Sequence, residues 1–103
     1  MSIHQEIDKL SKQIGVEASE FKISPIWKIV RKPEWSYGLS FEREFTVYEH
    51  KEMGYTIAVH SERHRAQFVN ENNEEVMGFA EMIVSVSEVE PHKSKHGTRW
   101  QFV

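Results

Sequence analysis

The sequence of 103 residues contains no cysteine. This absence excludes disulfide bonds, thiolate chemistry and zinc sites built on cysteine. No apolar run approaches the roughly 18 residues that a membrane-spanning helix needs, so we expect no membrane partner. The five glycines are scattered and form no phosphate-binding loop. The N-terminal segment is charged and amphipathic, unlike a signal peptide, and the cytoplasm is the expected compartment.

The length predicts a single domain over residues 1–103, because the chain is too short for two. Hydrophobic residues make up 39% and charged residues 28%, which is ordinary for a soluble protein with a modest core. The net charge of −3 is spread unevenly. Residues 71–90 contain six glutamates and no lysine or arginine, whereas residues 91–103 and 22–33 contain cations and no acid. Such segregation points to charged surfaces of opposite sign.

Residues 41–62 predict a β-hairpin at the centre of a small sheet. Apolar and polar side chains alternate along both halves with the period of two that is typical of strands. Gly54 can adopt the positive φ that the turn needs. A three-residue loop ending at Gly54 sets Val47 opposite Val59 and gathers the apolar side chains on one face. A four-residue loop would set Val47 opposite Ala58 and split them, so we predict the three-residue loop.

The N-terminus predicts a helix over about residues 3–14. Ser2 and Gln5 have the spacing of a capping box, and Gly15 is a natural stop. The apolar residues between them recur at helical spacing: Ile3, Ile7, Leu10 and Ile14.

Residues 16–37 fit two structures. Ser24 and Pro25 could begin a helical turn, but the sequence IWKIV that follows also reads as a strand. We favour the strand. Pro33 ends either version, and Trp27, Trp35 and Tyr37 are expected to cap the core.

A second helix is predicted over about residues 73–88. On a helical wheel the apolar residues between 76 and 86 share one broad face. The glutamates Glu74, Glu81 and Glu88 repeat every seven residues on the opposite side. The β-branched run IVSVSEV locally prefers a strand, but the wheel pattern favours the helix.

The remaining segments complete an α+β fold. Residues 66–70 and 98–103 read as strands, residues 70–73 as a turn and residues 91–97 as a basic loop. We predict a small antiparallel sheet of about four strands, with the hairpin 41–62 at its centre and both helices packed on one face.

Histidine is frequent, and two pairs have the spacing H-x-x-x-H: His60 with His64, and His92 with His96. On a helix this spacing suits zinc. The first pair straddles a strand end and the second lies in the expected loop, without a third ligand at a suitable spacing. We therefore expect no metal and no cofactor.

One weak catalytic pattern remains. In the predicted register, His60 lies near Glu44 and Tyr48 on the polar face of the hairpin. A histidine, a carboxylate and a phenol could perform acid–base chemistry, such as metal-independent RNA cleavage.

Basic and aromatic residues are interleaved in two segments, as in proteins that bind single strands by stacking and phosphate contacts. The candidate nucleic-acid-binding residues are Trp27, Lys28, Arg31, Lys32, Trp35, Lys93, Lys95, Arg99 and Trp100.

The leading hypothesis is a small non-catalytic protein that binds another protein through a charged surface, as accessory subunits, immunity proteins and phage- or plasmid-type inhibitors do. Glu74, Glu81 and Glu88 are its candidate partner-binding residues, and a protein with a basic surface is the expected partner. The alternatives are a nucleic-acid-binding module and a small histidine-dependent nuclease. The sequence makes no prediction of oligomeric state.

Overall fold

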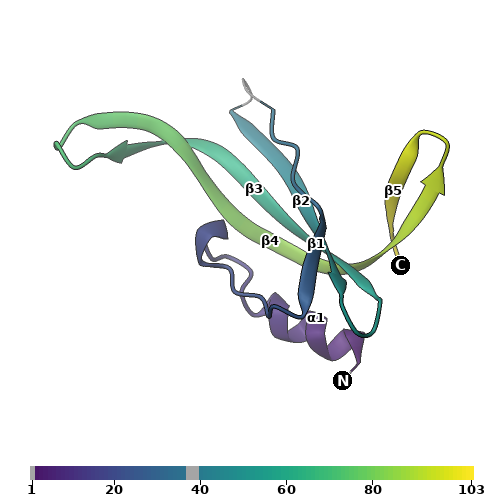
Figure 1. The fold of residues 1–103 in the computed structure, drawn as a ribbon. Helices are drawn as coiled ribbons and strands as arrows, with labels where there is room; N and C mark the ends of the chain where they lie inside the picture. Colours follow the sequence, from purple (N-terminus) through teal and green to yellow (C-terminus); the bar gives the residue numbers. More distant parts are fainter. Residues whose placement is uncertain (1, 37–39) are drawn as a thin grey trace.

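The computed structural model describes residues 2–36 and 40–103 (Figure 1). Each strand pairs antiparallel with the next strand along the chain, so the sheet has the order β1-β2-β3-β4-β5. No helix in the described part of the chain is long and apolar enough to cross a membrane. The described elements are the helix α1 (Ile3–Ser11), the short 3-10 helix η1 (Ala18–Glu20), and the strands β1 (Trp27–Arg31), β2 (Phe41–His50), β3 (Thr56–Val69), β4 (Glu75–Ser94) and β5 (Gly97–Phe102).

The N-terminal helix is confirmed, together with its cap. The Gln5 backbone N–H donates to Ser2 Oγ at 3.3 Å, and the Ser2 backbone N–H donates to Gln5 Oε1 at 3.0 Å. This reciprocal pair satisfies two donors that would otherwise have no intrahelical partner. The helix ends at Ser11, earlier than predicted, and turns carry the chain to Gly15 at φ 97°.

The predicted second helix at about 73–88 is wrong. Residues 75–88 belong to β4, a strand of 20 residues, and residues 73 and 74 precede it. Apolar side chains on both faces of a strand produced a spacing that also fits a helical wheel, and the β-branched run decided the local structure. Other boundaries change with it: β3 is one continuous strand through residue 69, and β4 extends to Ser94 through most of the predicted basic loop.

The central hairpin is confirmed, but its predicted register is wrong. Val47 pairs with Ala58, and Tyr48 pairs with Ile57. The loop therefore has the four-residue form, in which the Gly54 N–H donates to the His50 carbonyl oxygen at 2.9 Å and Gly54 has φ 78°. A slip of one residue places Val59 on the face opposite to Val47.

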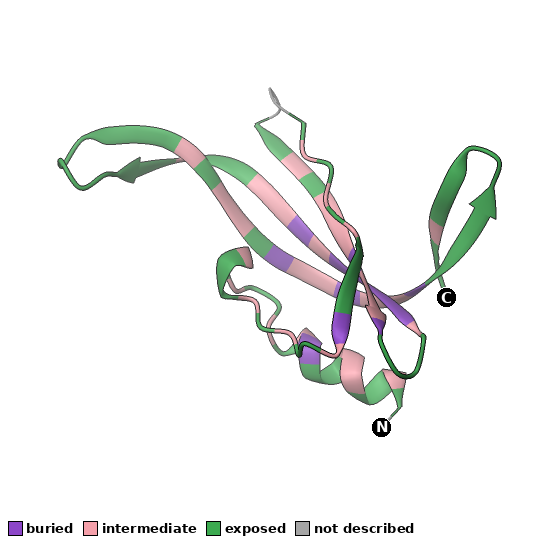
Figure 2. Ribbon diagram, in the orientation of Figure 1, coloured by how far each residue is buried: buried purple, intermediate pink, exposed green. Residues whose placement is uncertain are grey.

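The sheet consequently has a core on each face, and both are concentrated near its centre (Figure 2). The face covered by α1, here called the helix face, carries the larger cluster. Its buried members are Leu10, Trp27, Ile57, Val59, Ile83 and Val86. The opposite face carries a smaller cluster formed by Val47, Ala58 and Val89, with Phe45 and Trp100 packed against it.

The undecided segment contains the first strand, which confirms the favoured interpretation for residues 27–31. Trp27 is 5% exposed. Its ring meets the His50 ring edge-on at 4.9 Å between centroids and lies 6.0 Å from the Tyr55 ring. The last residue of that segment, Tyr37, lies outside the described residues.

The molecule is extended for its size. Its radius of gyration is 15.7 Å, whereas a compact chain of this length has about 13 Å. Its accessible surface is 7361 Å², about a fifth more than the roughly 6,100 Å² expected of a compact monomer of this mass. Two hairpins that project from the sheet account for this shape (Figure 1).

Candidate functional site

The first projecting hairpin, here called the arm, comprises residues 66–79. It contains the last part of β3, the first part of β4 and the turn between them. β2 pairs with β3 as far as His64, and beyond it the arm strands pair only with each other among the described residues. Every arm residue except Ala66 and Gly78 is exposed.

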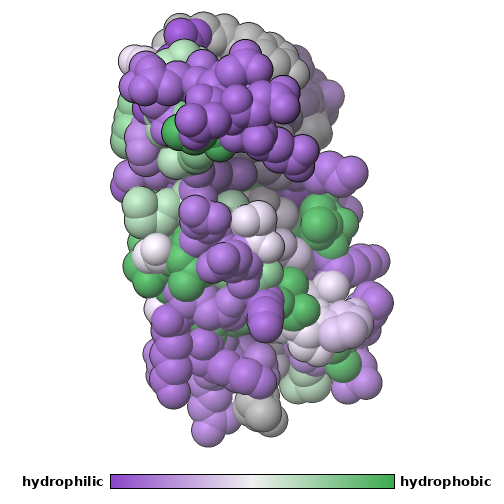
Figure 3. All heavy atoms as spheres, turned by 90° about the vertical axis from the view of Figure 1, so that its left-hand side faces the viewer, coloured by the Kyte–Doolittle hydropathy of each residue, from purple (hydrophilic) through white to green (hydrophobic). Residues whose placement is uncertain are grey.

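Large apolar side chains lie on both faces of the arm. Val69, Met77 and Phe79 follow one face by strand alternation, and Phe68 and Val76 are directly paired on the other. Val69 is 64% and Met77 is 60% exposed. Viewed from the arm's side, the molecule shows hydrophobic patches between hydrophilic side chains (Figure 3). A two-stranded hairpin covers neither of its own faces. Contiguous exposed apolar side chains are typical of interaction sites.

The base of the arm is anchored by a stacked arginine. The Arg63 guanidinium lies 4.7 Å from the Trp35 ring centroid and 4.1 Å from the Phe79 ring centroid. Arg63 Nη2 also donates to the Ser36 carbonyl oxygen at 2.7 Å. Two cation–π contacts to one guanidinium link Phe79 at the base of the arm to Trp35 in the segment after β1.

The tip of the arm is a well-formed acidic turn, which confirms the predicted turn at residues 70–73. Asn70 Oδ1 accepts hydrogen bonds from the backbone N–H groups of Asn72 at 3.0 Å and Glu74 at 2.9 Å. Asn73 has φ 62°, a conformation that asparagine tolerates. The arm carries three glutamates, Glu71, Glu74 and Glu75, and no lysine or arginine.

The second projecting hairpin, here called the ribbon, comprises residues 91–102 of β4 and β5. All of its residues except Trp100 are exposed. It carries Lys93, Lys95 and Arg99 and no acid. Among the described residues, none of these three cations forms an ion pair. A hollow of about 320 Å³ on the ribbon is lined by His92, Lys93, Ser94, His96, Arg99 and Gln101.

A further hollow of about 320 Å³ lies between η1 and the helix face. It is lined by Ala18, Ser19, Phe21, Thr46, Tyr48, Val59, Ser61, Glu81 and Ile83. Ser61 Oγ donates to Glu81 Oε1 at 3.3 Å. Burial raises the pKa of the Tyr48 phenol, which therefore remains a neutral hydrogen-bond donor. The volume is at the lower end of the range for small-ligand pockets.

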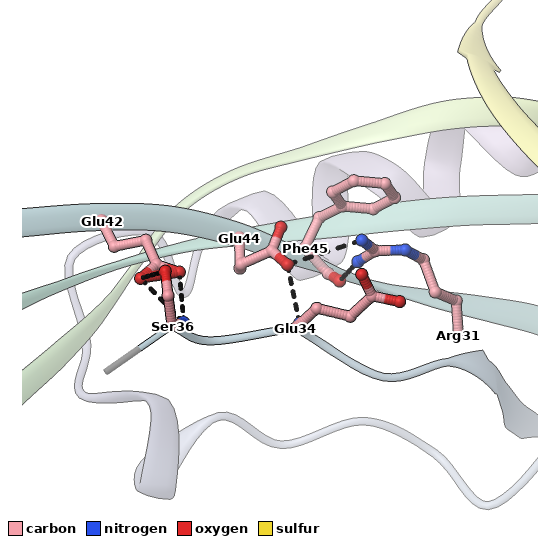
Figure 4. Close-up of polar contacts among 6 residues, drawn as sticks. All are labelled: Arg31, Glu34, Ser36, Glu42, Glu44 and Phe45. Atoms are coloured by element: carbon pink, nitrogen blue, oxygen red, sulfur yellow. Dashed lines mark hydrogen bonds and ion pairs between the residues drawn. The ribbon is translucent and has the colours of Figure 1, made fainter. Parts of the chain in front are cut away.

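A network of carboxylates holds residues 32–36 against the edge of β2 (Figure 4). The Ser36 N–H and hydroxyl donate to the Glu42 carboxylate, and the Glu34 N–H donates to Glu44 Oε1 at 2.7 Å. The Ser36 hydrogen bonds lower the pKa of Glu42. Arg31 Nη2 lies 3.5 Å from Glu44 Oε1.

Most side chains of the first predicted nucleic-acid-binding segment are therefore engaged in contacts within the fold. Trp27 is buried, and the charge of Lys28 is paired with Glu49 at 3.3 Å. Arg31 stacks on the Phe45 ring at 3.7 Å and pairs with Glu44. Trp35 stacks on Arg63, and Lys32 is exposed. The second segment forms the ribbon, where Trp100 packs on the core and the three cations face solvent.

The predicted acidic line is not formed. Glu74 lies in the turn at the tip of the arm and is exposed. Glu81 and Glu88 are half-buried on the helix face, opposite Arg63 and Ile57 respectively. Without the helix, a seven-residue repeat does not place these side chains on one exposed line.

The predicted trio of His60, Glu44 and Tyr48 is also not formed. His60 pairs with Phe45 on the face opposite to Tyr48. Its ring is stacked between the Phe45 and Phe102 rings, at 5.3 Å and 5.6 Å. Burial lowers the pKa of His60, and the charges of Arg43 and Arg31 lower it further, against a smaller opposite effect of Glu44. His60 Nε2 is buried and has no hydrogen-bond partner in the described part of the chain.

Neither histidine pair belongs to a metal-ligand cluster in the described ranges 2–36 and 40–103, where no group of three or more His, Asp or Glu side chains is placed to hold a metal ion.

Comparison with protein-family models, with curated proteins and with solved structures gives no match to this chain.

The apolar arm is the feature that sequence reasoning missed. Its signal was present in the alternation of residues 66–79, where both faces contain an apolar side chain. The assignment of residues 73–88 to a helix concealed it.

Proposed function

We propose that this chain is a small non-catalytic protein that binds a protein partner through its arm. The observation that carries this proposal is the set of large apolar side chains exposed on both faces of residues 66–79. An isolated two-stranded hairpin is marginally stable in water. Docking against a partner would remove this apolar surface from solvent and order the arm.

The composition of the arm suits protein recognition. Phenylalanine and methionine are enriched at protein interfaces, and a polar rim normally surrounds them. Here Glu71, Glu74 and Glu75 supply that rim. Their charge favours a partner with a basic surface, in agreement with the hypothesis drawn from the sequence.

Photo-crosslinking tests the proposal with a matched pair of positions. Met77 on the arm and Met53 in the β2–β3 turn are both 60% exposed. A photo-reactive amino acid at position 77, in the cells that produce the protein, should form adducts with a protein. The same group at position 53 should form none above background. Equal labelling at both positions would show that the arm is not a docking element.

The ribbon supports a second candidate function, nucleic-acid binding. Its three exposed cations and its hollow lined by His92, His96 and Arg99 could contact phosphates. Lys93→Glu with Lys95→Glu should then abolish a salt-sensitive gel shift with mixed-sequence DNA or RNA. Absence of any shift by the parent chain at physiological salt would reject this candidate.

A further inference from the structure

We infer that the partner of the arm is a second copy of this chain, in a two-fold pair where each arm lies against the ribbon of the other copy. This inference rests on the proposed function of the arm. It combines the charge, the placement and the accessible area of the two projecting hairpins.

The two hairpins are complementary in charge. The arm carries Glu71, Glu74 and Glu75 without a cation, and the ribbon carries Lys93, Lys95 and Arg99 without an acid. Their formal charges are therefore equal and opposite. Complementary patches of this kind steer association and set the orientation of partners.

The two hairpins cannot satisfy one another within one molecule. They project from opposite ends of the sheet (Figure 1). The ion pairs in the described part of the chain involve β1, β2 and β3, and none joins the arm to the ribbon. Both charge clusters therefore remain open to another molecule.

A reciprocal contact closes the assembly. If the arm of one copy meets the ribbon of a second copy, two-fold symmetry lets the second arm meet the first ribbon. Both arms and both ribbons are then used, whereas a single head-to-tail contact would leave one of each free and continue into an open chain.

The area available is sufficient. The surface exceeds that of a compact monomer by on the order of 1,300 Å². Each partner in a standard interface buries about 800 Å². The exposed Val69 and Met77, which share one face of the arm, would supply the apolar part of such an interface.

Charge reversal followed by mixing tests the pairing. The arm-reversed variant is Glu71→Lys, Glu74→Lys and Glu75→Lys, and the ribbon-reversed variant is Lys93→Glu, Lys95→Glu and Arg99→Glu. Light scattering coupled to size exclusion should show a dimer for the parent chain. Each variant alone should dimerise at least tenfold more weakly, because both of its reciprocal contacts become repulsive.

An equimolar mixture of the two variants should recover the dimer, because the arm and the ribbon are both basic in one copy and both acidic in the other. A control for net charge carries Asp8→Lys, Glu20→Lys and Glu52→Lys, three exposed acids outside the arm. This control should dimerise like the parent. Circular dichroism melting curves should confirm that every variant is folded.

Several outcomes would overturn the inference. They are variants that dimerise like the parent, a mixture that stays monomeric, or a mass that grows beyond two copies with concentration. A parent chain that is monomeric and binds DNA through the ribbon would also overturn it. If the parent is monomeric while position 77 still crosslinks to another protein, the inference fails and the proposed function stands. If position 77 crosslinks to nothing, both fail.

Discussion

β3 passes through two different environments while keeping the same neighbour, β4. Between Thr56 and Ser61 nearly every residue is buried, and Ile57 is fully inaccessible. In residues 65–69 the strand pairs with β4 as before, but most side chains are exposed. What differs is that the central part also pairs with β2 and is covered on both faces, by α1 on the helix face and by Trp100 on the other. The buried residues accordingly lie near the centre of the sheet (Figure 2).

The comparison separates two contributions to the stability of a sheet, backbone pairing and burial of apolar surface, which usually occur together. Backbone pairing continues along the whole of β3 and β4, but burial of apolar surface is confined to the central half. Since burial is the dominant favourable term in folding, the free energy of unfolding should come from the centre. The arm keeps its apolar surface available for another molecule.

The largest expected effect comes from placing the same charge in both regions. Val47 is 0% exposed at the centre, and Val69 is 64% exposed on the arm. Val47→Asp buries an unpaired carboxylate and should lower the free energy of unfolding by about 3–5 kcal/mol. Val69→Asp should change it by less than about 0.5 kcal/mol. Urea denaturation at concentrations low enough to keep the chain monomeric measures both, and similar losses would show that the arm is buried in the monomer.

A smaller effect comes from His60, which is stacked between two aromatic rings at the centre of the sheet. The folded-state pKa of His60 is lowered by burial and by Arg43 and Arg31, whereas in the unfolded chain it is about 6.5. As the pH falls through 6.5, the unfolded chain therefore binds a proton that the folded chain resists. The free energy of unfolding should fall with pH from about 6.5 downward, until the folded-state pKa is reached.

His60→Phe should reduce this fall and keep the stack between Phe45 and Phe102. Urea midpoints measured between pH 7 and pH 5 compare the two proteins. Parallel curves for the parent and His60→Phe would show that His60 does not contribute.

The smallest effect concerns two glycines. Gly54 has φ 78°, so Gly54→Ala should lower the free energy of unfolding by about 1 kcal/mol or more. At Gly78 no positive φ is required, but a Cβ would lie 3.1 Å from two ring carbons of Phe68. Phe68 is partly exposed and its ring can move, so Gly78→Ala should change global stability by less than about 0.5 kcal/mol. It should slow amide exchange in the arm, and a large global loss would mean that the Phe68 ring is fixed.

The sequence predicted the local features well. Ser2 and Gln5 located the start of α1, Gly54 marked the hairpin turn, and Asn70 identified the turn at the tip of the arm. Each of these features depends on hydrogen bonds or backbone angles within a few residues, which a single sequence contains.

Features that depend on what covers the sheet were not predictable in the same way. The register was chosen on the assumption of one apolar face, but α1 covers one face of the sheet and Trp100 packs on the other. The helix at 73–88 failed for the same reason, because apolar residues on two faces of β4 imitate a helical stripe. The candidate site inherited that error, since the line through Glu74, Glu81 and Glu88 required the helix.

The sequential strand order has a consequence for how the chain folds during synthesis. Each strand pairs with the strand made just before it, so every hairpin can close as soon as its second strand has left the ribosome. The helix α1 is different. It precedes all the described strands in the chain, but Leu10 belongs to a cluster with Ile83 and Val86 of β4. Its apolar stripe therefore stays exposed until most of the chain has been synthesised, and its docking completes the helix-face core.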